Sequence, residues 1–473
     1  MEFGELLRKT LQDNKIKITN FSSLIGMNRM AVYAVFNGKK RLSEDVFELI
    51  LEKFDFSPAQ VAQLNRLYYI DKTSKGRTEL LKTLKIEFES AGRPPFSNVM
   101  MFKDITVSSQ GVFLLGAVDY YSAIKAFLEN ERDSEDYEIF TNYPFLDTQA
   151  DSIVYDFVLN KKPSFRLRHT VLMGKDVPIE ERLRNVFASV KFGKLGHPVF
   201  SKNSKKGTDA FSVHFIGKNT VLQYDPQNEC GFLSVEPAVI SAYKLVASKN
   251  SEDESPLTEY SESAFELRNV LQPYQVDIFA VIGFKFPAYF FTTPDILEDT
   301  LKKDIPNRSV VFSAFWNHIS RNQTSVPEIM FLQQGLHEFA LNGIAYDASL
   351  LHLDPISLKH RKTLLERYKK NIIESDYSLK ILNSNSFRLR ENCELEIFGD
   401  SFALMFCNDS VSGGDFIGGC YILLEDKELS DLFKDFYNYS VLSEALLPQE
   451  YAEHFVDDLI SQCEAALQNT KEN

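Results

Sequence analysis

The chain has 473 residues, of which 44% are hydrophobic and 39 are phenylalanine, and its formal net charge is −14. Such a composition excludes a disordered protein and supplies apolar side chains for about three domains. The most apolar stretch, Val276 to Phe291, is interrupted by Asp277, Lys285 and Pro287, which excludes a membrane span. The five cysteines include no CxxC pair, so we expect a reducing, cytoplasmic location and no membrane partner.

The first part of the chain has the spacing of short helices separated by tight turns. Helices are expected over Phe3 to Asp13, Asn20 to Ile25 and Asn28 to Phe36. Gly26 permits the left-handed backbone that follows a helix, and Asn28 is a good N-cap for the next one. Two helices joined by such a turn form the unit that many proteins insert into DNA.

The helix expected at Asn28 to Phe36 has one apolar and one open face. Val32, Val35 and Phe36 are spaced to bury one side against the preceding helices. The other side, which we expect to meet a DNA groove, consists of Arg29, Met30, Tyr33 and Ala34.

A basic loop follows this helix. Asn37 and Gly38 end the helix, and Lys39, Lys40 and Arg41 come where a phosphate backbone would run. The first 43 residues carry a net charge of +5, which leaves −19 for the rest of a chain whose total is −14. The basic end is therefore where a polyanion can approach.

These features resemble the lambda-repressor and Cro-like (XRE-type) helix-turn-helix family over roughly residues 3 to 69. Ser22, a small residue, stands four positions before Gly26, and the family's Asn-Gly-Lys ending is present at Asn37-Gly38-Lys39. The resemblance implies base contacts from Arg29, Met30 and Ala34. It implies phosphate contacts from Asn28, Asn37, Lys39, Lys40 and Arg41.

The chain also departs from the pattern of that family. Phe36 stands where the family usually has Glu, and Leu42 stands where it has Pro. Its polar base-reading side chains are replaced by Met30, Ala31 and Ala34. Sequence discrimination is therefore expected to depend on Arg29 and Tyr33, on thymine methyl contacts or on DNA shape. A helical hairpin that only packs is the alternative.

Further helices are expected beyond this region. Ser43 caps a helix that runs through Phe54, and Ser57-Pro58 starts another. Thr78 to Glu89 is expected to form a connecting helix, followed by a stiff linker at Gly92 to Pro95. These features predict a DNA-binding domain at residues 1–72 and a helical linker at residues 73–95.

From about residue 96, strands alternate with helices. Tyr137 to Tyr143 is expected to be a strand, Thr148 to Leu159 a helix and Phe165 to Met173 a second strand. A strand-helix-strand unit of this kind favours an α/β sheet. The polar, acidic run Ser248 to Pro256 is interpreted as a solvated linker, which places the first α/β unit at residues 96–250.

The remaining part repeats this order of elements and is expected to form a second α/β unit at residues 257–473. A charged helix at Ile179 to Val190 precedes three strands and a helix in the first unit. A charged helix at Ser357 to Ile372 precedes three strands and a helix in the second. Internal duplication is the preferred explanation, and two unrelated modules are the alternative. The fold class is thus multidomain, with an all-α helix-turn-helix domain followed by two α/β units.

The order of elements in the body resembles the lobes of the phospholipase D superfamily, which include catalytically dead sensor domains. The enzymes of that superfamily need His-x-Lys with Asp five residues after the lysine. Here His214, Lys218 and Asp225 are separated by three and six intervening residues. No catalytic residue is therefore assigned, and the chain is expected not to be an enzyme.

Other catalytic and cofactor signals are missing from the sequence. The eight histidines show no HExxH or other metal-ligand spacing, so we expect no metal and no cofactor. His337-Glu338 is interpreted as a surface pair on a helix from Gln333 to Leu341. The glycine-rich run Ser412 to Gly419 lacks the GK[ST] ending of a phosphate loop and is interpreted as a loop between strands.

Together these patterns predict a cytoplasmic transcription regulator. We expect it to bind double-stranded DNA, to form a homodimer and to sense a small-molecule or peptide ligand through its α/β body. Two alternatives are left open. One is a diverged phosphodiesterase-type hydrolase with a DNA-targeting appendage, and the other is a phage- or defence-linked interaction protein that uses the same fold.

Overall fold

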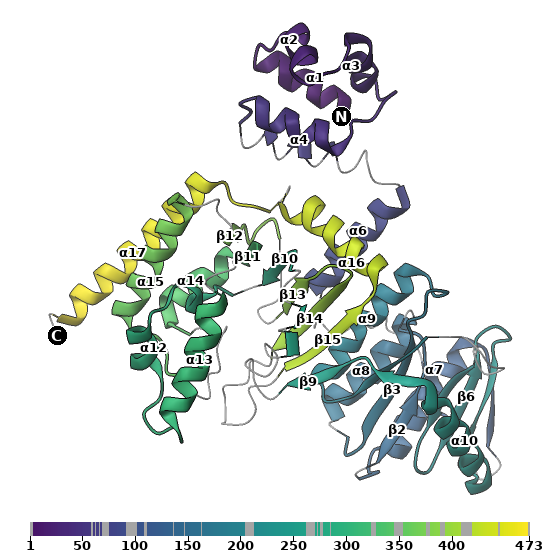
Figure 1. Ribbon diagram of the computed structural model, residues 1–473. Coiled ribbons are helices and arrows are strands. Elements are labelled where there is room, and N and C mark those ends of the chain that lie inside the picture. Colours follow the sequence, from purple (N-terminus) through teal and green to yellow (C-terminus); the bar gives the residue numbers. More distant parts are fainter. Residues whose placement is uncertain are drawn as a thin grey trace. The chain divides into compact units, whose positions relative to one another are not determined.

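The structure is a computed structural model, shown as a ribbon in Figure 1. It describes residues 3–57, 60–61, 63–65, 67–68, 75–90, 102–107, 111–135, 137–145, 147–161, 163–203, 212–261, 270–271, 273–274, 278–283, 285–322, 328–344, 353–374, 379–387, 393–407, 419–442 and 445–471. Two compact units divide the chain: unit 1 comprises Met1–Glu89, Ile278–Glu391 and Ser430–Asn473, and unit 2 comprises Ser90–Asp277 and Asn392–Leu429. Within the described ranges, no helix has the length and apolar character needed to cross a membrane.

The N-terminal region is helical, as the sequence predicts. Its helices are α1 (Phe3–Asp13), α2 (Ile18–Leu24), α3 (Arg29–Phe36) and α4 (Glu44–Lys53). They enclose their own apolar core, in which Phe21 and Ile50 are fully buried. α2 begins two residues before the predicted start, because the Lys17 carbonyl already accepts hydrogen bonds from the N–H groups of Asn20 and Phe21.

A capping box follows α4. Ser57 Oγ accepts a hydrogen bond from the Gln60 N–H at 3.3 Å, and Gln60 Oε1 accepts one from the Ser57 N–H at 3.0 Å. This reciprocal pair is typical of a helix start. It agrees with the helix expected there, although Pro58 itself lies outside the described residues.

The connecting helix expected at Thr78 to Glu89 is α6 (Lys75–Ser90). Within unit 1, its apolar face packs against α16 (Lys427–Phe436), where Phe88 stacks on Phe436 with ring centroids 5.1 Å apart. Arg77 Nε also pairs with Asp435 Oδ2 at 2.9 Å. The linker expected at Gly92 to Pro95 lies outside the described residues.

Unit 2 contains an eight-stranded sheet with the order β1-β7-β6-β5-β2-β3-β4-β8. β2, β3 and β4 are parallel, whereas β5, β6, β7 and β1 pair antiparallel. The strands are β1 (Val112–Leu115), β2 (Glu138–Thr141), β3 (Arg166–Leu172), β4 (Val199–Lys202), β5 (Val213–Ile216), β6 (Val221–Asp225), β7 (Cys230–Ser234) and β8 (Glu254–Pro256).

Helices cover both faces of this sheet (Figure 1). They are α7 (Gly116–Glu131), α8 (Thr148–Lys161), α9 (Ile179–Lys194) and α10 (Pro237–Asn250). Neighbouring residues of β6 show the two faces, because successive side chains of a strand point in opposite directions. Tyr224 stacks on Tyr120 of α7, whereas Gln223 accepts a hydrogen bond from Tyr243 of α10.

The run Ser248 to Pro256 corrects the sequence interpretation of a solvated linker. It forms the end of α10, a 3-10 turn at Ser251–Asp253 and the edge strand β8, which pairs with β4. The Glu254 side chain is only 1% exposed and binds Arg168 Nη2 at 3.0 Å and Thr170 Oγ1 at 2.9 Å. Of the three acidic residues in this run, Glu254 thus belongs to an ion pair, whereas Glu252 and Asp253 are exposed.

Unit 1 contains three parallel strands in the order β12-β11-β10. The strands are β10 (Ala280–Gly283), β11 (Glu328–Leu332) and β12 (Leu379–Leu382). Its other helical elements are η3 (Ala288–Phe291), α12 (Pro294–Thr300), α13 (Arg308–Asn322), α14 (Gln333–Asn342), α15 (Leu358–Glu374), η4 (Tyr437–Leu442) and α17 (Gln449–Lys471). Their core is rich in aromatic rings, among them Phe286, Phe331 and Tyr368.

A second set of antiparallel strands belongs to unit 2, in the order β13-β14-β15-β9. The strands are β13 (Cys393–Ile397), β14 (Ser401–Cys407), β15 (Gly419–Glu425) and β9 (Glu259–Ser261). The strand orders correspond to one another. β4-β3-β2 matches β12-β11-β10, and β5-β6-β7-β1 matches β13-β14-β15-β9. In both cases the edge strand, β1 or β9, precedes the parallel strands in the chain.

Candidate nucleic-acid interface

Two glycine turns fix both ends of the region around α3. After α2, Gly26 has a φ of 68°, and the Met27 N–H donates to the Ser22 carbonyl at 3.0 Å. After α3, Gly38 has a φ of 66°, and the Lys39 N–H donates to the Ala34 carbonyl at 2.8 Å. Both turns are Schellman motifs, which need a residue that adopts the left-handed conformation without strain.

Asn28 begins α3, as expected from the sequence. Its backbone is extended, and its side-chain oxygen accepts a hydrogen bond from the Ala31 N–H at 2.8 Å. This N-cap leaves other N–H groups of the first turn of α3 open to an acceptor, such as a phosphate oxygen.

The apolar face of α3 packs as predicted. Val32, Val35 and Phe36 are each less than 5% exposed. The Phe36 ring stacks on Phe21 with ring centroids 6.5 Å apart. Phe36 is therefore a core residue of the N-terminal helices.

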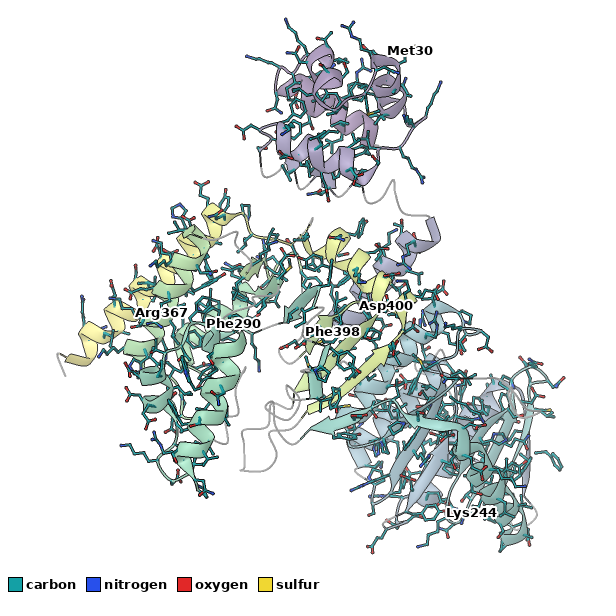
Figure 2. The ribbon with its side chains drawn as sticks, viewed as in Figure 1. Met30, Lys244, Phe290, Arg367, Phe398 and Asp400 are labelled. Carbon is teal, nitrogen blue, oxygen red and sulfur yellow. The ribbon has the colours of Figure 1, made fainter. Side chains whose placement is uncertain are left out.

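The opposite face of α3 is open to solvent. Met30 is 84% exposed and Tyr33 is 44% exposed, and Met30 is labelled on the outer side of α3 in Figure 2. Arg29 is also exposed, whereas Ala34 is partly buried. The five remaining candidate residues are all exposed: Asn28, Asn37, Lys39, Lys40 and Arg41. The structure thus brings the nine predicted DNA-contacting residues to the surface of one helix and its flanking turns.

Gly4 of α1 is a residue that the sequence analysis missed. A Cβ atom at this position would lie 2.2 Å from the Val35 carbonyl oxygen and 2.8 Å from that of Phe36. α1 therefore approaches the end of α3 so closely that only glycine fits. A lone glycine in a helix was the signal that could have revealed this contact.

The three residues compared with the phospholipase D motif have separate structural roles. His214 is 4% exposed in β5, and its ring lies 5.7 Å from that of Tyr243. The Lys218 N–H donates to Glu131 Oε2 at 3.1 Å in a turn. Asp225 accepts hydrogen bonds from the N–H groups of Gln227 and Asn228 in the β6–β7 hairpin. The His214 ring, the Lys218 backbone and the Asp225 carboxylate thus each make a contact within the fold of unit 2.

The other motifs give no site among the described residues. His337 and Glu338 lie on α14, as expected, and Glu338 Oε1 accepts a hydrogen bond from Gln334 at 2.9 Å. The glycine-rich run before Gly419 lies outside the described residues. Within the part of the chain that is described, no three His, Cys, Asp or Glu side chains are grouped as metal ligands would be.

Comparison with known proteins finds no family model that matches this chain and no significant match to a curated protein.

Proposed function

We propose that this protein is a cytoplasmic transcription regulator whose N-terminal helices bind double-stranded DNA. The observation that carries the proposal is the geometry of α3. Two glycine turns and an N-cap hold this helix with Arg29, Met30 and Tyr33 facing solvent. The basic residues Lys39, Lys40 and Arg41 follow directly at its end.

Each part of this surface suits a different part of a DNA duplex. Arg29 can donate two hydrogen bonds to a guanine, while Met30 and Ala34 offer apolar contact to thymine methyl groups. Lys39, Lys40 and Arg41 can neutralise phosphates next to the groove that the helix enters. The acidic remainder of the chain repels DNA, so it favours approach through this surface.

We further propose that the protein acts as a homodimer with a binding body. A single short helix reads only a few base pairs, and dimers gain affinity by reading two half-sites. The matching strand orders support an origin of the body by internal duplication. The structural roles of His214 and Asp225 support a body that binds a ligand without converting it.

A selection from a random-sequence duplex library tests the DNA proposal. Full-length protein is expected to enrich one motif whose half-sites are spaced by about 10 base pairs or a multiple of that distance. Light scattering on the same sample is expected to give twice the monomer mass. Failure to enrich any motif would contradict the regulator, whereas a single unpaired half-site with a monomer would contradict the dimer only.

A further inference from the structure

The outer edge of the eight-stranded sheet carries an exposed apolar surface. β1 is the last strand of this sheet, and no strand among the described residues pairs with its outer side. Phe113 is 87% exposed, more than any other large apolar side chain that is described, and Leu115 is 75% exposed. Together they form the apolar edge of β1. Such a group on an unpaired strand is a surface that another chain can cover.

The two side chains of the apolar edge lie on the same face of the sheet. Phe113 is opposite Phe232 in the β1–β7 ladder, and the Phe232 ring lies 5.7 Å from that of Tyr243 in α10. Leu115 comes two residues later, so it points to this face too. α10 packs over β5 and β6, whereas Leu114, on the opposite face of β1, is only 1% exposed. The fold therefore buries one face of β1 and leaves the other uncovered.

The backbone of β1 limits how a further strand can pair with it. The Gly116 N–H donates to the Glu229 carbonyl at 2.8 Å, so even-numbered residues direct their main-chain groups toward β7. The main-chain groups of Phe113 and Leu115 therefore point outward. The Leu115 N–H is occupied, because it donates to Asp119 Oδ2 at 3.1 Å. Phe113 is thus the position at which a further strand can exchange hydrogen bonds with β1.

Two other edge strands are protected in ways that β1 is not. In unit 1, the segment after η4 covers β12, and the Leu447 N–H donates to the Ile381 carbonyl at 2.9 Å. At the other end of the unit 2 sheet, β8 contains Pro256, which has no N–H to offer. Charged residues and proline are the usual means of protecting an edge. The strand Val112 to Leu115 contains neither.

We propose that the apolar edge of β1 pairs with the same edge of a second copy, antiparallel about a two-fold axis at Phe113. The choice of a second copy rests on the homodimer proposed above. The Phe113 N–H of each copy donates to the Phe113 carbonyl of the other, and the two Phe113 rings lie side by side. Each Leu115 is then diagonal to Phe113 of the other copy. The pair uses one surface twice, as a two-fold interface must.

Charge and area agree with a second copy as the partner. β1 carries no charge, so two identical strands can meet without repulsion, although the whole chain has a net charge of −14. Close to the strand, Asp119 is already paired with Lys103 at 2.7 Å. A buried phenylalanine contributes roughly 150 to 250 Å², whereas a stable interface buries about 1,200 Å² or more in total. The pairing is therefore expected to be weak and to depend on protein concentration.

Sedimentation of the full chain over a concentration series tests the apolar edge. Phe113→Lys places two like charges directly opposite each other at the axis, so it should weaken the dimer about tenfold or more. The fold should be unaffected, since this side chain is exposed. Val310→Lys, at an exposed position of α13, is the matched control and should leave the dimer unchanged. Equal dissociation constants for Phe113→Lys and the natural protein would overturn the proposal.

A charge swap tests whether Phe113 meets itself. Phe113→Lys and Phe113→Glu should each be largely monomeric, whereas an equal mixture of the two should form a dimer again, because opposite charges then meet at the axis. A mixture that stays as monomeric as its components would contradict pairing at Phe113.

Cross-linking tests the position of the axis. Residues that exchange both hydrogen bonds in an antiparallel pair have Cα atoms about 5.5 Å apart, within the reach of a disulfide. Phe113→Cys, with the exposed Cys230 replaced by Ser, should therefore form a disulfide-linked dimer under mild oxidation. Tyr451→Cys in the same background should not. Equal cross-linking of the two variants would overturn the proposal.

The outcomes separate this inference from the proposed function. A natural protein that is dimeric together with an equally dimeric Phe113→Lys would leave the homodimer intact and refute the apolar edge as its interface. A natural protein that stays monomeric would refute the homodimer and this inference together, but not DNA binding by α3. Replacement of Lys39, Lys40 and Arg41 should weaken DNA binding and leave the dimer intact.

Discussion

The surface of α3 and the interior of unit 2 present polar side chains in opposite ways. Arg29, Lys39 and Lys40 are exposed, whereas Tyr120 is buried and Asp147 is half-buried. Exposed cations attract a long polyanion from a distance and are screened by salt. Buried polar groups depend on contacts within the fold in place of water. The exposed basic surface is therefore the one suited to the salt-dependent interaction with a macromolecule that we propose.

The largest expected effect concerns the exposed basic residues that follow α3. Replacement of Lys39, Lys40 and Arg41 by Ala should reduce DNA affinity by more than tenfold at low salt. The slope of log affinity against log salt should flatten by about 2 to 3, since each neutralised phosphate contributes about −0.9. Fluorescence anisotropy over a salt series measures both quantities.

A control for this variant removes three lysines outside the N-terminal region. Lys303, Lys359 and Lys370 are all exposed, and their joint replacement by Ala should leave the slope unchanged. Equal slopes for the two triple variants would mean that the basic loop after α3 does not contact phosphates.

Arg29 is expected to contact bases, so its replacement should affect sequence discrimination more than general DNA affinity. Arg29→Ala should cost about 1 to 3 kcal/mol of discrimination between the selected motif and a scrambled duplex. Arg8→Ala removes the same charge from an exposed position of α1 and should lower affinity for both duplexes alike. Similar losses of discrimination in the two variants would contradict base reading by Arg29.

Gly4 tests how closely α1 must approach α3. Gly4→Ala should destabilise the N-terminal helices by about 1 to 3 kcal/mol, because the new methyl group meets the Val35 and Phe36 carbonyls. Gly76→Ala in α6 is the matched control, since nothing lies within 4 Å of its Cβ. That change should be neutral or slightly stabilising. Hydrogen exchange of α1 and α3 amides reports the difference.

A buried histidine of unit 2, His197, allows a test of how burial affects stability. Burial lowers the pKa of His197 from 6.5 to about 4, so the folded protein keeps it neutral while the unfolded chain takes up a proton below pH 6.5. The stability that this histidine contributes is present above pH 6.5 and is lost as the pH falls toward 4. The expected slope is about 1.4 kcal/mol per pH unit.

Urea unfolding at pH 7, 6 and 5 measures this slope. His197→Gln can still accept the hydrogen bond that Leu167 N–H donates to His197 Nδ1 at 3.1 Å, but it cannot take up the proton. The pH dependence of stability should therefore be weaker in this variant than in the natural protein. His454→Gln, at an exposed position, should keep the full slope.

The sequence predicted the parts of the molecule that depend on neighbouring residues. Asn28 caps α3, Gly26 adopts the left-handed turn expected of it, and α3 ends before Gly38 as predicted. These features are decided by hydrogen bonds between residues at most five positions apart, and such bonds form wherever the local sequence allows them. The outward face of α3 follows from the helical period once Val32 and Val35 are buried.

The tertiary structure decided what depends on distant parts of the chain. The acidic run before Pro256 suggested a solvated linker, but Arg168 is present to pair with Glu254, so the segment forms the edge strand β8. Tyr121 and Asp147 likewise come together only in the folded unit, where the Tyr121 hydroxyl of α7 donates to Asp147 Oδ1 at 3.2 Å. A local pattern sets the conformation of a segment, but it does not reveal which distant side chain will replace its water on burial.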